Sequence, residues 1–353
     1  MNPDSNFSLV DELDDDNPAE TFEKIRSTGR IAPSATATGR HHQARRGVVQ
    51  KKAPPGAEQF IHAQDDSVRT FEFSYKAARF EASWLLASLR YFYEQHWIAD
   101  VLRKIKVGKE ASVYLCRSGE LVNAPLVVAK VYRPRMLRAL KNDNLYREGR
   151  QVLDENGKPV VDLGMLKAQH KRSVYGEQIR HQSWIAHEYY TLQTLHQAGA
   201  NVPRPYEMAN NAILMEYLGD ETRPAPTLNE VTLSPGEPAH LFGHIEHNLD
   251  LLLEAGLVHG DLSAYNILYW NGGITLIDFP QVVPVKENRN AYALFERDVV
   301  RLCEYFIRQG LTLPSRRLAA KLWTRHGYRL KTEIDPHLLD AEDPLDRKLW
   351  EEG

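Results

Sequence analysis

The stretch Leu257–Gln281, LVHGDLSAYNILYWNGGITLIDFPQ, decides the expected fold. A His-Gly-Asp triplet ends at Asp261, Asn266 stands five residues later, and Asp278 follows a short apolar run. This order is typical of a phosphoryl-transfer site, where one aspartate orients the acceptor hydroxyl while an asparagine and a second aspartate hold Mg²⁺. The structural alternative is an apolar hairpin with polar turn residues, but such a hairpin does not require Asp, Asn and Asp at these offsets.

Upstream, Lys130 interrupts the apolar strand pattern VVAKVY. A lysine at such a position lowers stability unless its ammonium group meets anions. In phosphoryl-transfer enzymes these anions are nucleotide phosphates and a helix glutamate. Glu188, on the inward side of a helix predicted over 183–199, is the expected partner, and Glu177 is the competing candidate. The alternative for Lys130 is a solvent-exposed strand lysine.

Further segments are expected to contact the nucleotide. The stretch 108–112, GKEAS, lies between two predicted strands, where its backbone N–H groups and a serine hydroxyl can meet phosphate. Beyond an apolar strand predicted over 212–217, the backbone can contact the adenine edge. The expected nucleotide contacts are Gly108, Lys109, Ala111, Ser112, Lys130, Glu216, Tyr217, Ser263 and Asn266. The expected catalytic residues are Lys130, Glu188, Asp261 and Asp278, and the metal ligands are Asn266 and Asp278.

Bulk properties limit the class of protein. The chain has 353 residues and a formal net charge of −3, so no global field draws it to nucleic acid or membrane. Two cysteines cannot build a disulfide framework, which indicates a reducing cytoplasm. No apolar run reaches the roughly 18 residues of a membrane span, and the N-terminus lacks the pattern of a secretory signal.

The chain divides into three expected parts. Residues 1–65 resemble a disordered tail with an acidic run and basic pairs, read either as a solvated linker or as an arm that binds nucleic acid or the ribosome. Residues 66–218 are expected to form a helical cap over 68–103 and a strand-rich N-lobe that carries a basic insertion at 133–180. Residues 219–353 are expected to form a helical C-lobe. The predicted fold class is α+β and bilobal.

Taken together, these motifs resemble those of the RIO atypical protein kinases, in the bacterial-type branch without an N-terminal winged helix. The matching segments, in order, are GKEA (108–111), VVAKVYR (127–133), WIAHEYYTL (184–192), AILMEYLG (212–219), LVHGDLSAYNIL (257–268) and LIDFPQVV (276–283). Gly260 stands where ordinary kinases carry an arginine, and Asp298 resembles the aspartate that supports the catalytic loop. Lys106 and Val107 depart from the family pattern, which has a small hydroxyl pair before the loop glycine.

The resemblance implies a protein-kinase-like fold that uses ATP and Mg²⁺ to phosphorylate serine in a protein or in the chain itself. It also implies that Asp278 can become phosphorylated in an ATPase-like cycle. Because the family is linked to maturation of the small ribosomal subunit, the basic tail and insertion are candidate contacts to that subunit or to RNA.

Two other functions compete with this hypothesis. Aminoglycoside and choline phosphotransferases share the HGDL and IDF motifs, although they carry a larger helical region after the metal aspartate. A catalytically idle kinase fold that docks on RNA or the ribosome is the second alternative. The intact set of Lys130, Asp261, Asn266 and Asp278 favours chemistry over an idle scaffold.

Overall fold

The computed structural model describes residues 71–108, 110–133, 151–154, 157–160, 174–209 and 211–330, which fall within one compact unit, Gly56–Gly353. The predicted tail at 1–65 and most of the predicted insertion at 133–180 lie outside the described residues. Among the residues described, no helix has the length and apolar character needed to cross a bilayer.

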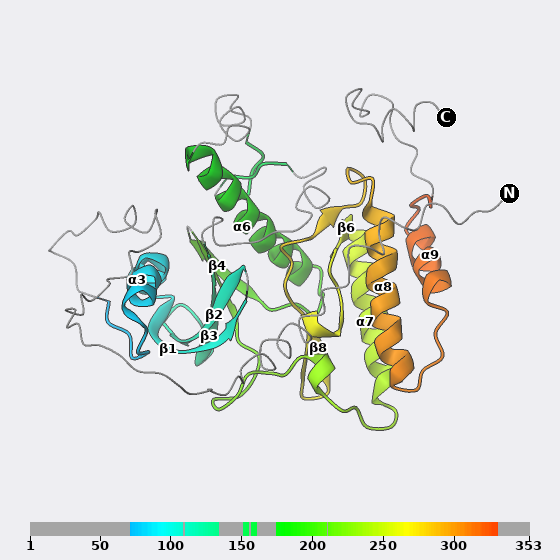
Figure 1. The fold of residues 1–353 in the computed structure, drawn as a ribbon, viewed down its shortest axis with the longest axis horizontal. Coiled ribbons are helices and arrows are strands. Elements are labelled where there is room, and N and C mark those ends of the chain that lie inside the picture. Colours follow the sequence, from blue (N-terminus) through cyan, green and yellow to red (C-terminus); the bar gives the residue numbers. More distant parts are fainter. Residues whose placement is uncertain are drawn as a thin grey trace, which may run out of the picture. The chain divides into compact units, whose positions relative to one another are not determined.

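The N-lobe is built on a five-stranded antiparallel sheet with the strand order β1-β2-β3-β5-β4 (Figure 1). The strands are β1 (Ile98–Val107), β2 (Ala111–Ser118), β3 (Leu126–Tyr132), β4 (Pro205–Ala209) and β5 (Ala212–Glu216). Side chains alternate between the two faces of a strand. On β3 the residues Val127, Ala129 and Val131 therefore join the apolar cluster beneath α3 (Arg79–Glu94), while Val128 and Tyr132 join the cluster shared with the helical lobe.

The predicted helix over 68–103 is wrong at both ends of the described range, because residues 71–78 are not helical and residues 98–107 form β1. The helix ends at Glu94, and His96 takes a positive φ of 59°. The Trp97 N–H donates to the Phe92 carbonyl at 2.8 Å and the His96 N–H to the Tyr93 carbonyl at 3.1 Å, the bonds of a Schellman motif. The chain reverses there, and pairing with β2 outweighs the local helical pattern.

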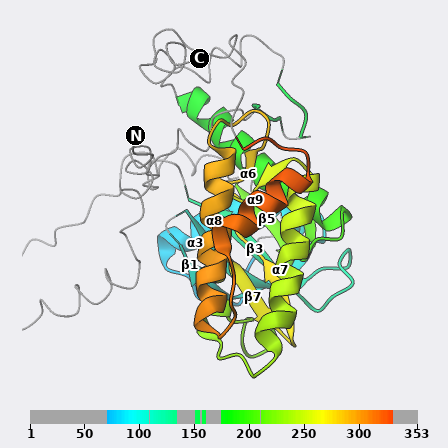
Figure 2. The ribbon, with the colours of Figure 1, turned by 90° about the vertical axis from the view of Figure 1, so that its right-hand side faces the viewer.

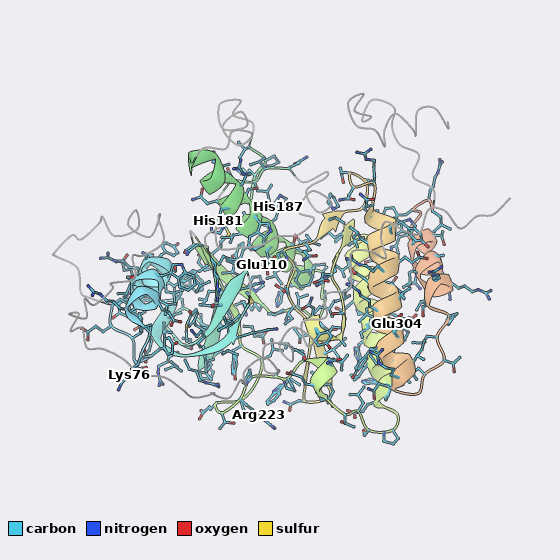
Figure 3. All side chains as sticks on the ribbon, in the orientation of Figure 1. Lys76, Glu110, His181, His187, Arg223 and Glu304 are labelled. Carbon is cyan, nitrogen blue, oxygen red and sulfur yellow. The ribbon has the colours of Figure 1, made fainter. Side chains whose placement is uncertain are left out.

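Helix α6 (Val174–Gln197) crosses from the insertion to the sheet and begins earlier than the predicted Ser183. Ser183 is no cap. It lies inside the helix, and its hydroxyl accepts a hydrogen bond of 2.9 Å from the Leu153 N–H. His187, labelled on α6 in Figure 3, contacts the Gln151 carbonyl, so the helix also holds the described residues of the insertion.

The C-lobe is mainly helical, as predicted. Its helices are α7 (Glu237–Glu254), α8 (Ala291–Arg308) and α9 (Ser315–Arg325), with a short 3₁₀ turn, η4, at Leu228–Glu230. Figure 2 shows α9 against both α7 and α8, and the Phe242 and Phe306 rings of α7 and α8 meet at 5.2 Å. Together with the antiparallel sheet, these helices confirm the α+β, bilobal prediction.

The C-lobe also contains two small antiparallel strand pairs, which lie in the segment between α7 and α8. The strands β6 (Leu257–Val258) and β9 (Val283–Pro284) flank the predicted catalytic stretch. Between them, the 3₁₀ turn η5 (Ala264–Asn266) leads into the hairpin of β7 (Ile267–Trp270) and β8 (Gly273–Leu276). The catalytic stretch therefore contains a pair of short strands joined by a turn.

Candidate active site

Lys130 lies at the centre of the candidate site. It sits on the β3 face opposite α3, and its side chain is 13% exposed. The Lys130 ammonium donates to Glu188 Oε1 at 2.6 Å and to Asp278 Oδ1 at 2.5 Å. The predicted contact with Glu188 is present, whereas Glu177 has no described side chain. The contact with Asp278 was not predicted and joins β3 to the segment after β8.

The two carboxylates keep Lys130 charged. Burial alone would lower the pKa of Lys130, but the charges of Asp278 and Glu188 outweigh burial and raise it. In the same way, burial tends to raise the pKa of Asp278, and the Lys130 ammonium overcomes this and lowers it. An ammonium group and a carboxylate thus face each other at the site where phosphate and metal are expected.

The β7–β8 hairpin brings Asn266 and Asp278 together. Ile267 pairs with Leu276 at the end of the hairpin, and the Ile277 N–H donates to the Asn266 carbonyl at 2.9 Å. Asp278 then takes a left-handed conformation with φ 71°, which is uncommon for a residue with a side chain. The two expected metal ligands therefore flank the same strand pair from opposite ends of its sequence.

The oxygen donors at this position fit Mg²⁺. The Asn266 amide Nδ2 donates to the Asp261 carbonyl at 2.8 Å, which leaves the amide oxygen as the coordinating group. Mg²⁺ is commonly held by one or two protein oxygens plus waters and substrate phosphates. In the described part of the chain, no cluster of three or more His, Cys, Asp or Glu is arranged to hold a metal.

Asp261 is fixed by contacts from its own loop and from α8. Arg301 NH1 lies 3.1 Å from Asp261 Oδ1, and Asn266 Nδ2 lies 3.4 Å from Oδ2. Burial raises the pKa of Asp261, and the Arg301 and Arg297 guanidinium groups oppose this effect. Because its side chain is 41% exposed, the carboxylate can be reached by an acceptor hydroxyl.

Helix α8 also holds the backbone of the catalytic loop. The Gly260 N–H donates to Asp298 Oδ2 at 2.8 Å, and Arg297 donates to the Gly260 carbonyl. Gly260 has φ 80°, a conformation that disfavours side chains and accounts for glycine before Asp261. Asp298 is 1% exposed, and burial raises its pKa to about 7. Asp298 thus supports the loop, as its place in the sequence indicated.

His259 has a structural environment. It is 1% exposed, its Nε2 lies 3.2 Å from the Ile277 carbonyl, and its Nδ1 accepts from the Asp261 N–H at 3.3 Å. Burial lowers the pKa of His259 to about 4, so the ring is neutral near pH 7. A neutral imidazole with a donor and an acceptor both engaged holds the loop and the Asp278 segment together.

The predicted phosphate loop is only partly in place. The Gly108 N–H already donates to the Ala111 carbonyl at 2.8 Å, which closes a tight turn, and Lys109 lies outside the described residues. Ser112 pairs with Val131, so it points to the sheet face opposite Lys130 and is 3% exposed. Ala111 lies in the cluster on the Lys130 face.

Two other predicted nucleotide contacts, Glu216 and Tyr217, lie at the end of β5 and just beyond it. The Glu216 N–H donates to the Arg204 carbonyl at 2.9 Å, so this N–H already has a partner. The Tyr217 hydroxyl donates to the Asp220 carbonyl at 2.9 Å and so orders the segment after β5. Ser263 precedes η5 and accepts the Asn266 N–H through its backbone carbonyl, so closing this turn is its visible role.

Sequence reasoning missed three residues of the site. Arg301 lies three residues after Asp298 on α8, and Arg297 lies four residues before Arg301, so helical periodicity from Asp298 would have found first Arg301 and then Arg297. Tyr132 lies two residues after Lys130 on β3, where strand alternation puts both side chains on one face. Its hydroxyl donates to Glu188 Oε2 at 2.6 Å.

Part of the chain matches the model of a known domain. The model of the RIO domain matches residues 145–318. The matched range contains Glu188, Asp261, Asn266 and Asp278 but begins after Lys130.

Curated relatives are kinases of the Rio1 group. The chain is 31% identical over 207 residues to the RIO-type serine/threonine-protein kinase Rio1 of Haloferax volcanii, an alignment covering 58% of this chain and 63% of that relative. It is 29% identical over 240 residues to Rio1 of Methanocaldococcus jannaschii, covering 68% and 71%. It is 26% identical over 217 residues to human serine/threonine-protein kinase RIO1, covering 61% and 35%. The chain thus spans less than two thirds of the Haloferax relative and about a third of the human one.

Among solved structures, the chain is similar to the Rio2 kinase of Chaetomium thermophilum. The TM-score is 0.48 at 22% identity, and the superposition covers 81% of this chain and 77% of that one.

Proposed function

We propose that this chain is a RIO-type serine/threonine protein kinase that transfers the γ-phosphate of ATP, a proposal supported by the match of the RIO domain model to residues 145–318 and by the similarity to Rio1 kinases. The observation that carries the proposal is the contact of Lys130 with both Glu188 and Asp278, which sets an ammonium group beside the expected metal ligand. A solvated strand lysine would have neither partner.

Each residue of the site has a proposed task. Lys130, held by Glu188, binds the phosphates of ATP, and Asn266 and Asp278 hold Mg²⁺, which supplies positive charge for the transferring phosphoryl group. Asp261 receives the hydrogen bond of the acceptor hydroxyl and orients its oxygen toward the γ-phosphate. Arg301 and the backbone contacts to Gly260 keep Asp261 in place. The Glu216 carbonyl meets the adenine edge.

The proposal also covers the phosphate acceptor, the branch of the family, the location and the partners. The acceptor is serine or threonine in a protein or in the chain itself, and phosphorylation of Asp278 gives an ATPase-like cycle. Membership of the bacterial-type branch rests on the motifs alone, since the relatives above are named Rio1 and come from archaea and eukaryotes. Action in the cytoplasm and contact with the small ribosomal subunit or RNA stay predictions.

An assay with γ-labelled ATP and Mg²⁺ tests the proposal. For Asp261→Ala we expect nearly intact nucleotide binding and a turnover lower by about 10²-fold or more, the range of general-base catalysis. Glu304→Ala, which removes an exposed carboxylate of α8 labelled in Figure 3, is the matched control and should retain wild-type turnover. Unchanged turnover in Asp261→Ala would reject the role of Asp261.

The chemical stability of the label separates the outcomes. Label that resists hydroxylamine indicates serine or threonine, and label that hydroxylamine releases indicates an acyl phosphate on Asp278. If the wild-type chain gave no label and released no phosphate, the result would contradict a protein kinase. A screen of small hydroxyl compounds would then separate a small-molecule phosphotransferase from a scaffold.

A further inference from the structure

The Glu188 carboxylate has two partners on β3, one for each oxygen. Oε1 accepts from the Lys130 ammonium at 2.6 Å, and Oε2 accepts from the Tyr132 hydroxyl at 2.6 Å. Glu188 is 1% exposed and Tyr132 is fully buried. A carboxylate held at both oxygens has lost the freedom to turn about its side-chain bonds, so its position depends on Tyr132 as well as on Lys130.

Tyr132 also receives a second contact from α6. The Trp184 ring, one helical turn before Glu188, packs edge-on against the Tyr132 ring with centroids 5.0 Å apart and an interplanar angle of 85°. The same tyrosine therefore meets α6 at two points, through its ring and through its hydroxyl. This arrangement fixes the rotation of α6 relative to β3 near Glu188.

Lys130 has a competing partner. Its ammonium lies 2.5 Å from Asp278, the expected metal ligand, as well as 2.6 Å from Glu188. If Glu188 turned away, Asp278 would be the remaining carboxylate, and the lysine would shift toward it. An ammonium group held by Asp278 alone would lose the second carboxylate that fixes its position for phosphate, and it would occupy an oxygen that Mg²⁺ would need.

We propose that Tyr132 is a positioning residue that locks Glu188 in place, so that Lys130 keeps this partner when the phosphates of ATP replace Asp278 at its ammonium group. The inference rests on the proposed function and deepens it. In many kinases the pairing of lysine with the helix glutamate is controlled by movement of the helix. Here the hydroxyl of Tyr132 holds the glutamate of that pair in place. Burial, and then the Glu188 charge, raise the pKa of Tyr132 well above its usual value, so the hydroxyl remains a donor near pH 7.

The first test compares two buried tyrosines that differ in their place in the sheet. Tyr132→Phe removes only the hydroxyl that reaches Glu188. Tyr114→Phe is the matched control, because Tyr114 is 1% exposed and donates to another carboxylate, Glu81 Oε1, at 2.8 Å, on the sheet face away from Lys130. Binding of ATP with Mg²⁺ and binding of adenosine, which has no phosphates, are measured by calorimetry for each variant.

We expect Tyr132→Phe to weaken ATP binding by about ten-fold, as for loss of one hydrogen bond to a charged group, and to leave adenosine binding unchanged. Tyr114→Phe should change neither affinity. If the role of Tyr132 were merely structural, Tyr132→Phe would change the affinities for ATP and adenosine together or would change neither. Equal ATP affinity in the two variants, or parallel loss of adenosine binding in Tyr132→Phe, would overturn the inference.

A second test needs no nucleotide. In a double-mutant cycle, the free energy of unfolding in urea is measured for Tyr132→Phe, Glu188→Gln and the double variant. A locked pair gives non-additive effects, whereas additive effects overturn the lock. A wild-type chain that binds no ATP contradicts the proposed function itself, while wild-type binding together with an additive cycle contradicts only the role of Tyr132.

Discussion

At the scale of single residues, the site depends on two left-handed backbone positions. Gly260 has φ 80° and Asp278 has φ 71°. Glycine adopts this conformation without a steric penalty, whereas a residue with a side chain stays there only when its surroundings hold it. For Asp278 the surroundings are the hydrogen bond from Lys130 and the hairpin that precedes it. The strained residue is thus also the expected metal ligand.

Asp298 is the buried acid of the site that most affects stability as pH changes. Burial raises its pKa to about 7, against an ordinary value of 3.8, and the nearby Arg297 opposes this only in part. A folded pKa above the unfolded value means that the folded chain retains a proton between these two values. The resulting stabilisation is complete below the unfolded pKa and is lost as pH rises through about 7.

We therefore predict the pH dependence of Asp298→Asn. The amide keeps an acceptor oxygen for the Gly260 N–H but does not titrate. The melting temperature of the wild-type chain should fall relative to that of Asp298→Asn as pH rises from about 5 to about 8. Differential scanning calorimetry at several pH values measures this difference. A difference that stays constant over the range would show that Asp298 remains ionised throughout.

At the scale of elements, the hairpin of β7 and β8 sets the distance between the two metal ligands. Its turn is Asn271-Gly272, with φ 50° and 78°, the pair of positive φ values that a type I′ turn requires. This turn aligns Ile267 with Leu276 and so brings Asn266 to the Ile277 backbone. The turn at the far end of the hairpin thus affects the active site, because it sets the strand register that places Asn266 beside Ile277.

Gly272→Ala tests the turn. A Cβ at this position has no heavy atom within 4 Å, so only the backbone conformation is strained, and we expect a loss of about 1–2 kcal/mol in the free energy of unfolding. Gly243→Ala on α7 is the matched control, also with no heavy atom within 4 Å. Because Gly243 lies inside a helix, alanine there should stabilise by about 0.5–1 kcal/mol. Urea unfolding measures both, and equal effects would contradict the assigned turn.

At the scale of the whole molecule, Lys130 joins the sheet to the segment that follows β8. It holds Glu188 of α6 and Asp278 of the C-lobe at the same time. In the proposed reaction, phosphate takes the place of one carboxylate at Lys130, and Asp278 turns to Mg²⁺. Nucleotide binding would then exchange a direct contact between the lobes for one that runs through the ligand.

Ligand-induced stabilisation tests this exchange. ATP with Mg²⁺ at about 100 times its dissociation constant should stabilise the folded chain by about 2.7 kcal/mol. We expect Asp278→Ala to lose the part of this stabilisation that depends on Mg²⁺. Thermal unfolding with ATP, with and without excess EDTA, measures that part. Retained Mg²⁺-dependent stabilisation in the variant would reject Asp278 as a metal ligand.

Much of the site could be predicted from the sequence because its residues are close in the chain. Asp261, Asn266 and Asp278 lie within one stretch of short strands and turns, whose spacing sets their geometry. Lys130 was recognisable because a charge in an apolar strand requires a partner. The resemblance to a known family then supplied the expected roles.

Other features depended on contacts between distant segments. The first part of β1, residues 98–103, was read as helix because only pairing with β2 distinguishes it. The contacts of Tyr132, Arg301 and Asp278 with their partners arise where β3, α6, α8 and the catalytic loop pack together. The sequence by itself determined which groups carry the proposed chemistry, since residue types and local spacing specify them. Only the tertiary structure decided which groups hold them in place, because those partners are distant in the chain and meet through packing.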